Sequence, residues 1–236
     1  METHKIKTWR DPYDEGFSTT RRKEIELHKG LTVLVGCNGS GKTTLLRNIK
    51  EVCKEEEVPV VYYDSREDEK SFKGEASLSS RFDLIATSMA SSEGENINIM
   101  LGNLASKLGR FVHTGESINK SDRLAKAFRL AAGIEGEEKK EIQSNERFIL
   151  MDAVDSGFSI DNIIDLKQYL FKTMIEDAEK HNIDLYIIIS ANSYELANGE
   201  SCFDVMEGQY ITFKNYEAYK KFILRTAEKK RKRYED

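Results

Sequence analysis

A glycine-rich segment between an apolar run and an amphipathic stretch constrains this chain more than any other feature. The segment reads Gly36-Cys-Asn-Gly-Ser-Gly-Lys-Thr and has the spacing G-x-x-x-x-G-K-[ST] at every fixed position. The preceding run, Leu31-Thr-Val-Leu-Val, has the composition of a short buried strand. The residues that follow place an apolar side chain on one helical face at Leu45, Leu46, Ile49 and Val52. A strand, a glycine loop and a helix in this order predict a phosphate-binding loop.

The chemistry of phosphate binding explains the residue types in this loop. Its glycines let the backbone curl, so that several N–H groups point at one phosphate group. The N-terminus of the following helix adds partial positive charge. We expect Lys42 to reach the β- and γ-phosphates and Thr43 to offer its hydroxyl to Mg²⁺. The residues predicted to bind the nucleotide here are Gly36, Asn38, Gly39, Ser40, Gly41, Lys42, Thr43 and Thr44.

An aspartate at the end of a second buried strand is the predicted acidic partner of the loop. The strand reads Arg147-Phe-Ile-Leu-Met and is followed directly by Asp152. We expect Asp152 to hold Mg²⁺, either directly or through water. The alternative is an ordinary strand that ends in a helix N-cap.

The remaining pattern predicts strands that alternate with helices. Further strands are expected at 5–9, 25–27, 58–63, 185–189 and 210–213, and further helices at 95–108, 123–132, 160–181 and 215–236. Polar stretches at 64–80 and 133–146 indicate loops. The alternation predicts an α/β fold with a mainly parallel sheet flanked by helices and an N-terminal antiparallel β piece. We expect one domain over 1–236, with a helical subdomain at about 65–147 and a basic helical tail at about 215–236.

Composition and charge exclude several classes of protein. The 36 basic and 41 acidic residues give a net charge of −5, which argues against a globally basic nucleic-acid coat. No apolar run approaches the roughly 20 residues that a membrane helix needs, and the N-terminus lacks the apolar core of a secretion signal. Three unclustered cysteines make a disulfide framework or a zinc–cysteine site improbable. The sequence therefore predicts a cytoplasmic protein without membrane insertion.

Three segments resemble ABC-type ATPases of the SMC/RecF-like branch, in the order that this family has them. The phosphate loop is the first, Ser91-Ser-Glu-Gly-Glu resembles the family's signature motif, and Asp152-Ala-Val-Asp-Ser-Gly-Phe-Ser resembles its acidic motif and D-loop. The resemblance spans roughly residues 5–213. It implies a P-loop NTPase fold of the ABC class, ATP and Mg²⁺ as cofactors, and a short stand-alone AAA-type ATPase without a long coiled coil.

The resemblance also implies an ATP-dependent homodimer. In the family, the signature motif of one subunit closes on the γ-phosphate held by the other, and Ser92 and Gly94 stand at the matching positions. An anion at the start of the predicted 95–108 helix is physically favourable. A serine N-cap with acidic residues in the first turn is the ordinary alternative, and the two readings are compatible.

The sequence departs from the family at three catalytic positions. Ala153 stands where the family carries the glutamate that polarises the attacking water, so slow hydrolysis is expected, with Asp155 as the nearest substitute. A switch histidine is missing after the 185–189 strand, where Asn192 could bind a phosphate oxygen. No glutamine lies between Thr44 and Ser91, and Asp64 is the closest polar replacement near the metal. A solvated turn is the alternative role for Asp64.

Two further features bear on ligands and partners. We expect Tyr13 to stack on adenine. Packing in the core is the alternative, and it is the commoner role of an aromatic ring. Residues 220–233 carry eight Lys or Arg against Glu228 alone. This tail could contact nucleic acid, or it could be a solvated helix end favoured by the helix dipole.

Three functions fit these observations. The first is a stand-alone ABC/SMC-like ATPase in DNA transactions, or a phage or bacterial accessory factor that acts on an unidentified protein partner. The second is a nucleotide-dependent switch with almost no catalysis, which Ala153 favours. The third is the ATPase subunit of a membrane transporter. The short stretch between phosphate loop and signature, which has no glutamine, argues against the transporter.

Overall fold

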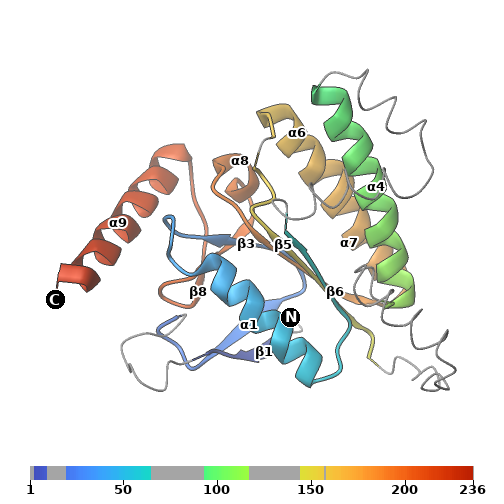
Figure 1. The fold of residues 1–236 in the computed structure, drawn as a ribbon, viewed down its shortest axis with the longest axis horizontal. Helices are drawn as coiled ribbons and strands as arrows, with labels where there is room; N and C mark the ends of the chain where they lie inside the picture. Colours follow the sequence, from blue (N-terminus) through green and yellow to red (C-terminus); the bar gives the residue numbers. More distant parts are fainter. Residues whose placement is uncertain (1–2, 10–19, 65–92, 117–143, 157, 236) are drawn as a thin grey trace, which may run out of the picture.

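The computed structural model describes residues 3–9, 20–64, 93–116, 144–156 and 158–235 (Figure 1). A six-stranded sheet in the order β4-β5-β6-β3-β7-β8 forms the centre of the molecule. Its strands are β3 (Gly30–Val35), β4 (Val60–Asp64), β5 (Glu146–Asp152), β6 (Asp184–Ser190), β7 (Ser201–Asp204) and β8 (Gln209–Ile211). All neighbouring strands pair in parallel except β7 and β8. The predicted α/β fold with a mainly parallel sheet is confirmed.

A separate two-stranded antiparallel sheet confirms the expected N-terminal β piece. It pairs β1 (Thr3–Lys7) with β2 (Glu24–His28). The first strand ends two residues earlier than predicted, because the Trp9 N–H donates to Asn48 Oδ1 in helix α1 (Lys42–Glu55) instead of to a strand.

Helices cover the two faces of the central sheet. In Figure 1, α1 and β1 lie on one side, and α4 (Glu93–Thr114), α6 (Ile160–Asp165) and α7 (Lys172–Lys180) lie on the other. Alternate strand residues face the two layers. In β3, Leu34 packs toward α1, whereas Val33 and Val35 pack in the cluster that contains α4 and α7. The sheet is therefore buried on both faces, as its nearly continuous apolar strands require.

The predicted helices differ from the structure in their bounds and regularity. Helix α4 begins at Glu93, not at 95, and continues to Thr114. The segment predicted as one helix at 160–181 contains α6, a π-helical stretch η1 (Leu166–Phe171) and α7. Strand β7 and the short helix α8 (Tyr194–Ala197) were not predicted. The 123–132 helix, the 64–80 loop from residue 65 and most of the 133–146 loop lie outside the described residues.

The basic C-terminal segment forms helix α9 (Tyr216–Glu235), as expected. The part of α9 up to Thr226 is not a free tail, since Tyr219, Phe222 and Thr226 are buried. Among the helices of the described ranges, none has the length and apolar character that crossing a membrane requires.

Candidate nucleotide site

Three neighbouring strands bring the predicted phosphate loop and Asp152 to the same edge of the sheet. The loop follows the carboxyl end of β3, Asp152 ends β5, and β6 lies between these two strands and ends at Ser190. Ser190 Oγ donates a hydrogen bond to Asp152 Oδ1 and accepts one from the Ala153 N–H at 2.8 Å. The carboxyl edge of a parallel sheet is where ligands bind in open α/β folds.

The backbone of the loop requires glycine at its turning points. Gly36, Gly39 and Gly41 have φ angles of 152°, 72° and 99°. A Cβ atom on Gly36 would lie 2.5 Å from Ser40 Oγ, closer than real contacts allow. The three glycines of the motif therefore stand where the backbone of the loop turns tightly.

Lys42 folds back over this loop. Its ammonium Nζ donates to the carbonyl oxygens of Gly36 at 2.8 Å and Cys37 at 3.3 Å, and the side chain is buried. Burial lowers the pKa of Lys42, and the negative charges of Asp155 and Asp152 act in the opposite direction. The loop thus holds the Lys42 ammonium group against its own carbonyl oxygens.

Within the described residues, the hydroxyl of Ser40 is buried and has no hydrogen-bond partner. A buried hydroxyl without a partner is costly, and a phosphate oxygen would satisfy it. The nearby Lys42 and the N-terminus of the 14-residue helix α1 also favour an anion. The side chains present therefore fit a nucleotide phosphate.

The residues predicted to hold Mg²⁺ supply oxygen donors, which this ion prefers. Asp152 is 7 % exposed and accepts a hydrogen bond from the Tyr62 hydroxyl at 3.4 Å in addition to the one from Ser190. Thr43, in the first turn of α1, offers its hydroxyl. Asp64 pairs in register with Asp152 on the neighbouring strand, so its backbone lies at the same edge. Metal binding by these residues stays a prediction.

The residues after Asp152 form a sharp turn. Ala153 has a φ of 50°, in the left-handed region that non-glycine residues rarely adopt. The Asp155 carboxylate accepts from the backbone N–H groups of Asn192 at 2.8 Å and Ser193 at 2.6 Å. Asp155 therefore positions the loop after β6, and its predicted part in hydrolysis stays untested.

The other predicted residues within the described ranges lie on the phosphate loop, on α1, on α4 and after β6. The Asn192 side chain is exposed, and its carbonyl accepts a hydrogen bond from the Tyr219 hydroxyl at 2.8 Å. Asn38 and Thr44 are exposed on the loop and on α1. Gly94 lies in the first turn of α4. Tyr13 and Ser92 lie outside the described residues.

Helix α9 contacts the phosphate loop directly, and nothing in the predicted elements led us to expect this contact. The buried N–H of Cys37 donates to Thr226 Oγ1 at 3.1 Å, and Lys230 Nζ donates to the Asn38 carbonyl at 3.0 Å. The signal that could have revealed this docking is the spacing of Tyr219, Phe222 and Thr226, which share one face of a helix amid the charged residues.

The basic residues of α9 divide between the phosphate-loop contact, ion pairs with glutamates and solvent. Lys229 pairs with Glu207 at 2.8 Å and Lys232 with Glu228 at 3.1 Å. Lys220, Lys221, Arg225 and Arg231 are exposed. Contact with nucleic acid through these residues stays a prediction.

Replacing Thr226 by valine is expected to destabilise the protein by about 1–3 kcal/mol, because the buried Cys37 N–H loses its acceptor while the side-chain volume is kept. Thermal unfolding should show a loss of roughly 2–4 °C per kcal/mol for a chain of this size. Thr226→Ser keeps the oxygen and should be close to wild type, as should Thr212→Val at an exposed site. Equal melting temperatures for the two valine variants would show that the contact contributes nothing.

A family model described as an AAA domain matches residues 15–235, a range that includes the phosphate loop, Asp152 and all of α9. A search of curated proteins found no match. AAA-type ATPases generally use ATP and Mg²⁺, which agrees with the donors and the cation found at the loop. The chain therefore belongs to the AAA-domain family of P-loop ATPases.

Proposed function

We propose that this protein binds Mg-ATP at residues 36–44 and that bound ATP joins two copies into an ATP-sandwiched homodimer. In this proposal it is a slow ABC/SMC-like ATPase that acts in DNA transactions or as a bacterial or phage accessory factor. The observation that carries the proposal is the position of Lys42 and the unpartnered Ser40 hydroxyl inside the glycine loop.

Binding would proceed by an exchange of partners at the loop. Lys42 Nζ leaves the Gly36 and Cys37 carbonyls and contacts phosphate oxygens, which offer it a full negative charge. Backbone N–H groups of the loop and the Ser40 hydroxyl donate to the same phosphates. Thr43 and Asp152 would hold Mg²⁺, which neutralises charge on the phosphate oxygens.

Slow hydrolysis follows from the residues after Asp152. The methyl group of Ala153 cannot accept a proton from water. The Asp155 carboxylate already accepts two backbone hydrogen bonds, which hold it in the turn. Retained binding with weak turnover is the behaviour of a nucleotide-dependent switch.

The dimer is proposed from the resemblance, and one feature of α4 and one of α6 support it. Gly94 lies in the first turn of α4, where backbone N–H groups are free of helical partners. Ile160 and Ile164, one turn apart on α6, are 61 % and 44 % exposed. This helix directly follows the 152–159 segment that resembles the acidic motif and D-loop. Apolar side chains beside that segment suit a surface that a partner covers.

Solution mass with and without Mg-ATP tests this proposal. The expected result is a doubling of the 27.0 kDa mass on addition of Mg-ATP, measured by light scattering. Ser92→Arg should bind ATP and remain monomeric, because the new side chain would fill the space for the partner's phosphate. The matched control is Ser106→Arg on an exposed face of α4, which should dimerise. A wild-type protein that binds ATP and stays monomeric would contradict the homodimer.

A further inference from the structure

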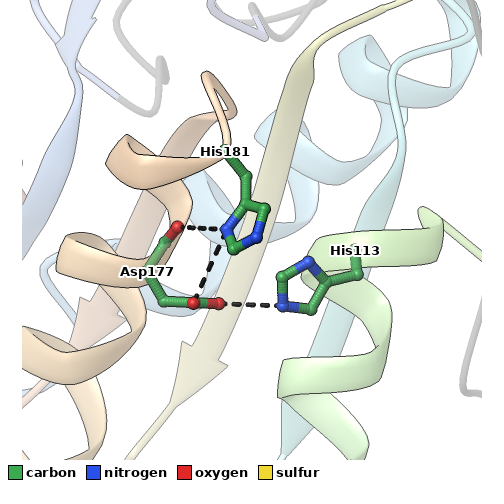
Figure 2. Close-up of side chains that lie close together, drawn as sticks. All are labelled: His113, Asp177 and His181. Atoms are coloured by element: carbon green, nitrogen blue, oxygen red, sulfur yellow. Dashed lines mark hydrogen bonds and ion pairs between the residues drawn. The ribbon is translucent and has the colours of Figure 1, made fainter.

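A cluster of two histidines and one aspartate joins the C-terminal ends of α4 and α7 (Figure 2). These two helices lie on the other side of the central sheet from α1, the helix that follows the phosphate loop (Figure 1). His113 comes from α4, Asp177 from α7, and His181 directly follows α7. His113 Nε2 lies 2.8 Å from Asp177 Oδ2, and His181 Nδ1 lies 3.6 Å from Asp177 Oδ1. The two imidazole rings meet edge to face with their centroids 4.8 Å apart.

These three side chains have the donor types of a transition-metal site. One ligand atom from each lies within 4.8 Å of the others. A tetrahedral ion with bonds of about 2.1 Å needs its ligand atoms roughly 3.4 Å apart. The side chains are 41–54 % exposed, so they have room to rotate toward that spacing, and an ion can reach them from solvent.

Backbone geometry prepares His181 for this role. Its Nδ1 lies 2.8 Å from the Asp177 carbonyl oxygen, which can only accept, so Nδ1 carries the proton and Nε2 keeps its lone pair. Metal-binding histidines usually donate their other ring N–H in this way. In neutral His113 the proton on Nε2 would move to Nδ1, and Nε2 would then be free for the ion.

The contact of His181 with the Asp177 carbonyl is an ordinary feature of a helix end, and the contact of His113 with the Asp177 carboxylate is an ordinary ion pair. They do not explain why imidazoles from two separate segments converge on one carboxylate. We propose that His113, Asp177 and His181 bind one divalent transition-metal ion of the zinc type, with the fourth position open to water. Such an ion would tie the end of α4 to the body of the domain. The site is independent of the nucleotide function proposed above.

Zinc binding to the full chain tests the proposal. The protein, freed of metal with a chelator, is titrated with ZnCl₂ in competition with a chromophoric chelator. Excess Mg²⁺ is present to occupy oxygen-only sites. One Zn²⁺ per chain is expected, with a rise in melting temperature. His113→Gln and His181→Gln should each weaken binding at least about tenfold, since the loss of an outer-shell partner alone costs this much.

His4→Gln is the matched control, because His4 also lies between two carboxylates, Glu56 and Glu146, at 3.0 Å each. It should bind zinc as the wild type does. The three cysteines are buried and so do not offer a surface site. If His113→Gln fails to fold, His181→Gln decides the question. The proposal is overturned if the wild type binds no zinc, if both cluster variants bind it unchanged, or if only His4→Gln loses it.

Discussion

Replacing Lys42 by methionine is expected to weaken Mg-ATP binding about 100-fold. A charged hydrogen bond contributes about 1.5–3 kcal/mol, and every 1.4 kcal/mol changes the dissociation constant tenfold. Lys42 Nζ is the cation inside the loop, where it now donates to the Gly36 and Cys37 carbonyls. Methionine is an unbranched side chain one atom shorter than lysine, so it fills most of the same space without the charge and the donors.

The readout is the rise in melting temperature that a saturating ligand produces. Mg-ATP should raise the melting temperature of the wild type, whereas the Lys42→Met variant should show little or no rise. Lys54→Met is the matched control, since Lys54 lies on the exposed side of the same helix and pairs with Glu51 at 3.2 Å. An equal rise for Lys42→Met and Lys54→Met would mean that nucleotide binds somewhere else.

The second large effect is expected at Ala153. Ala153→Glu should raise phosphate release from ATP about 100-fold, the lower end of what a positioned general base contributes. The position directly follows Asp152, and its N–H is fixed by Ser190 Oγ at 2.8 Å, so the new carboxylate would start from a defined backbone. The left-handed φ of 50° already tolerates a Cβ atom at this residue.

Ala153→Gln separates base catalysis from a change in the turn. Glutamine has the same size and cannot take a proton, so its phosphate release should remain at the wild-type rate. A steady-state assay on the three proteins at saturating Mg-ATP gives the comparison. If the glutamate and glutamine variants hydrolyse ATP equally, the missing carboxylate does not limit turnover.

The parts of this molecule that depend on local sequence could be predicted. The loop at 36–43 specifies its own backbone, because glycines stand where φ is positive and a Cβ at Gly36 would clash. The strands β5 and β6 were also predicted, because they are unbroken apolar runs. The helix α1 was predicted because its apolar side chains recur on one helical face. The position of Asp152 at the ligand-binding edge was predictable because this residue ends the apolar run of β5.

The parts that depend on contacts between distant segments could not be predicted. Strand β7 has only four residues, and its pairing with β3 defines it more than its composition does. The charge of α9 suggested a solvated or nucleic-acid-binding helix, whereas Thr226 and Lys230 hold it against the phosphate loop. The carboxylate of Asp155 accepts a hydrogen bond from the backbone after β6, and no spacing in the sequence reveals this partner.

Isothermal titration of Mg-ATP into the wild-type protein would test the nucleotide site itself. The structure predicts saturable binding of one ATP per chain, with weaker binding in EDTA because Thr43 and Asp152 then lack the ion that joins them to the phosphates. Folded protein that gives no saturable binding heat, at several temperatures and at high nucleotide concentration, would contradict the assignment of residues 36–44 as an ATP site.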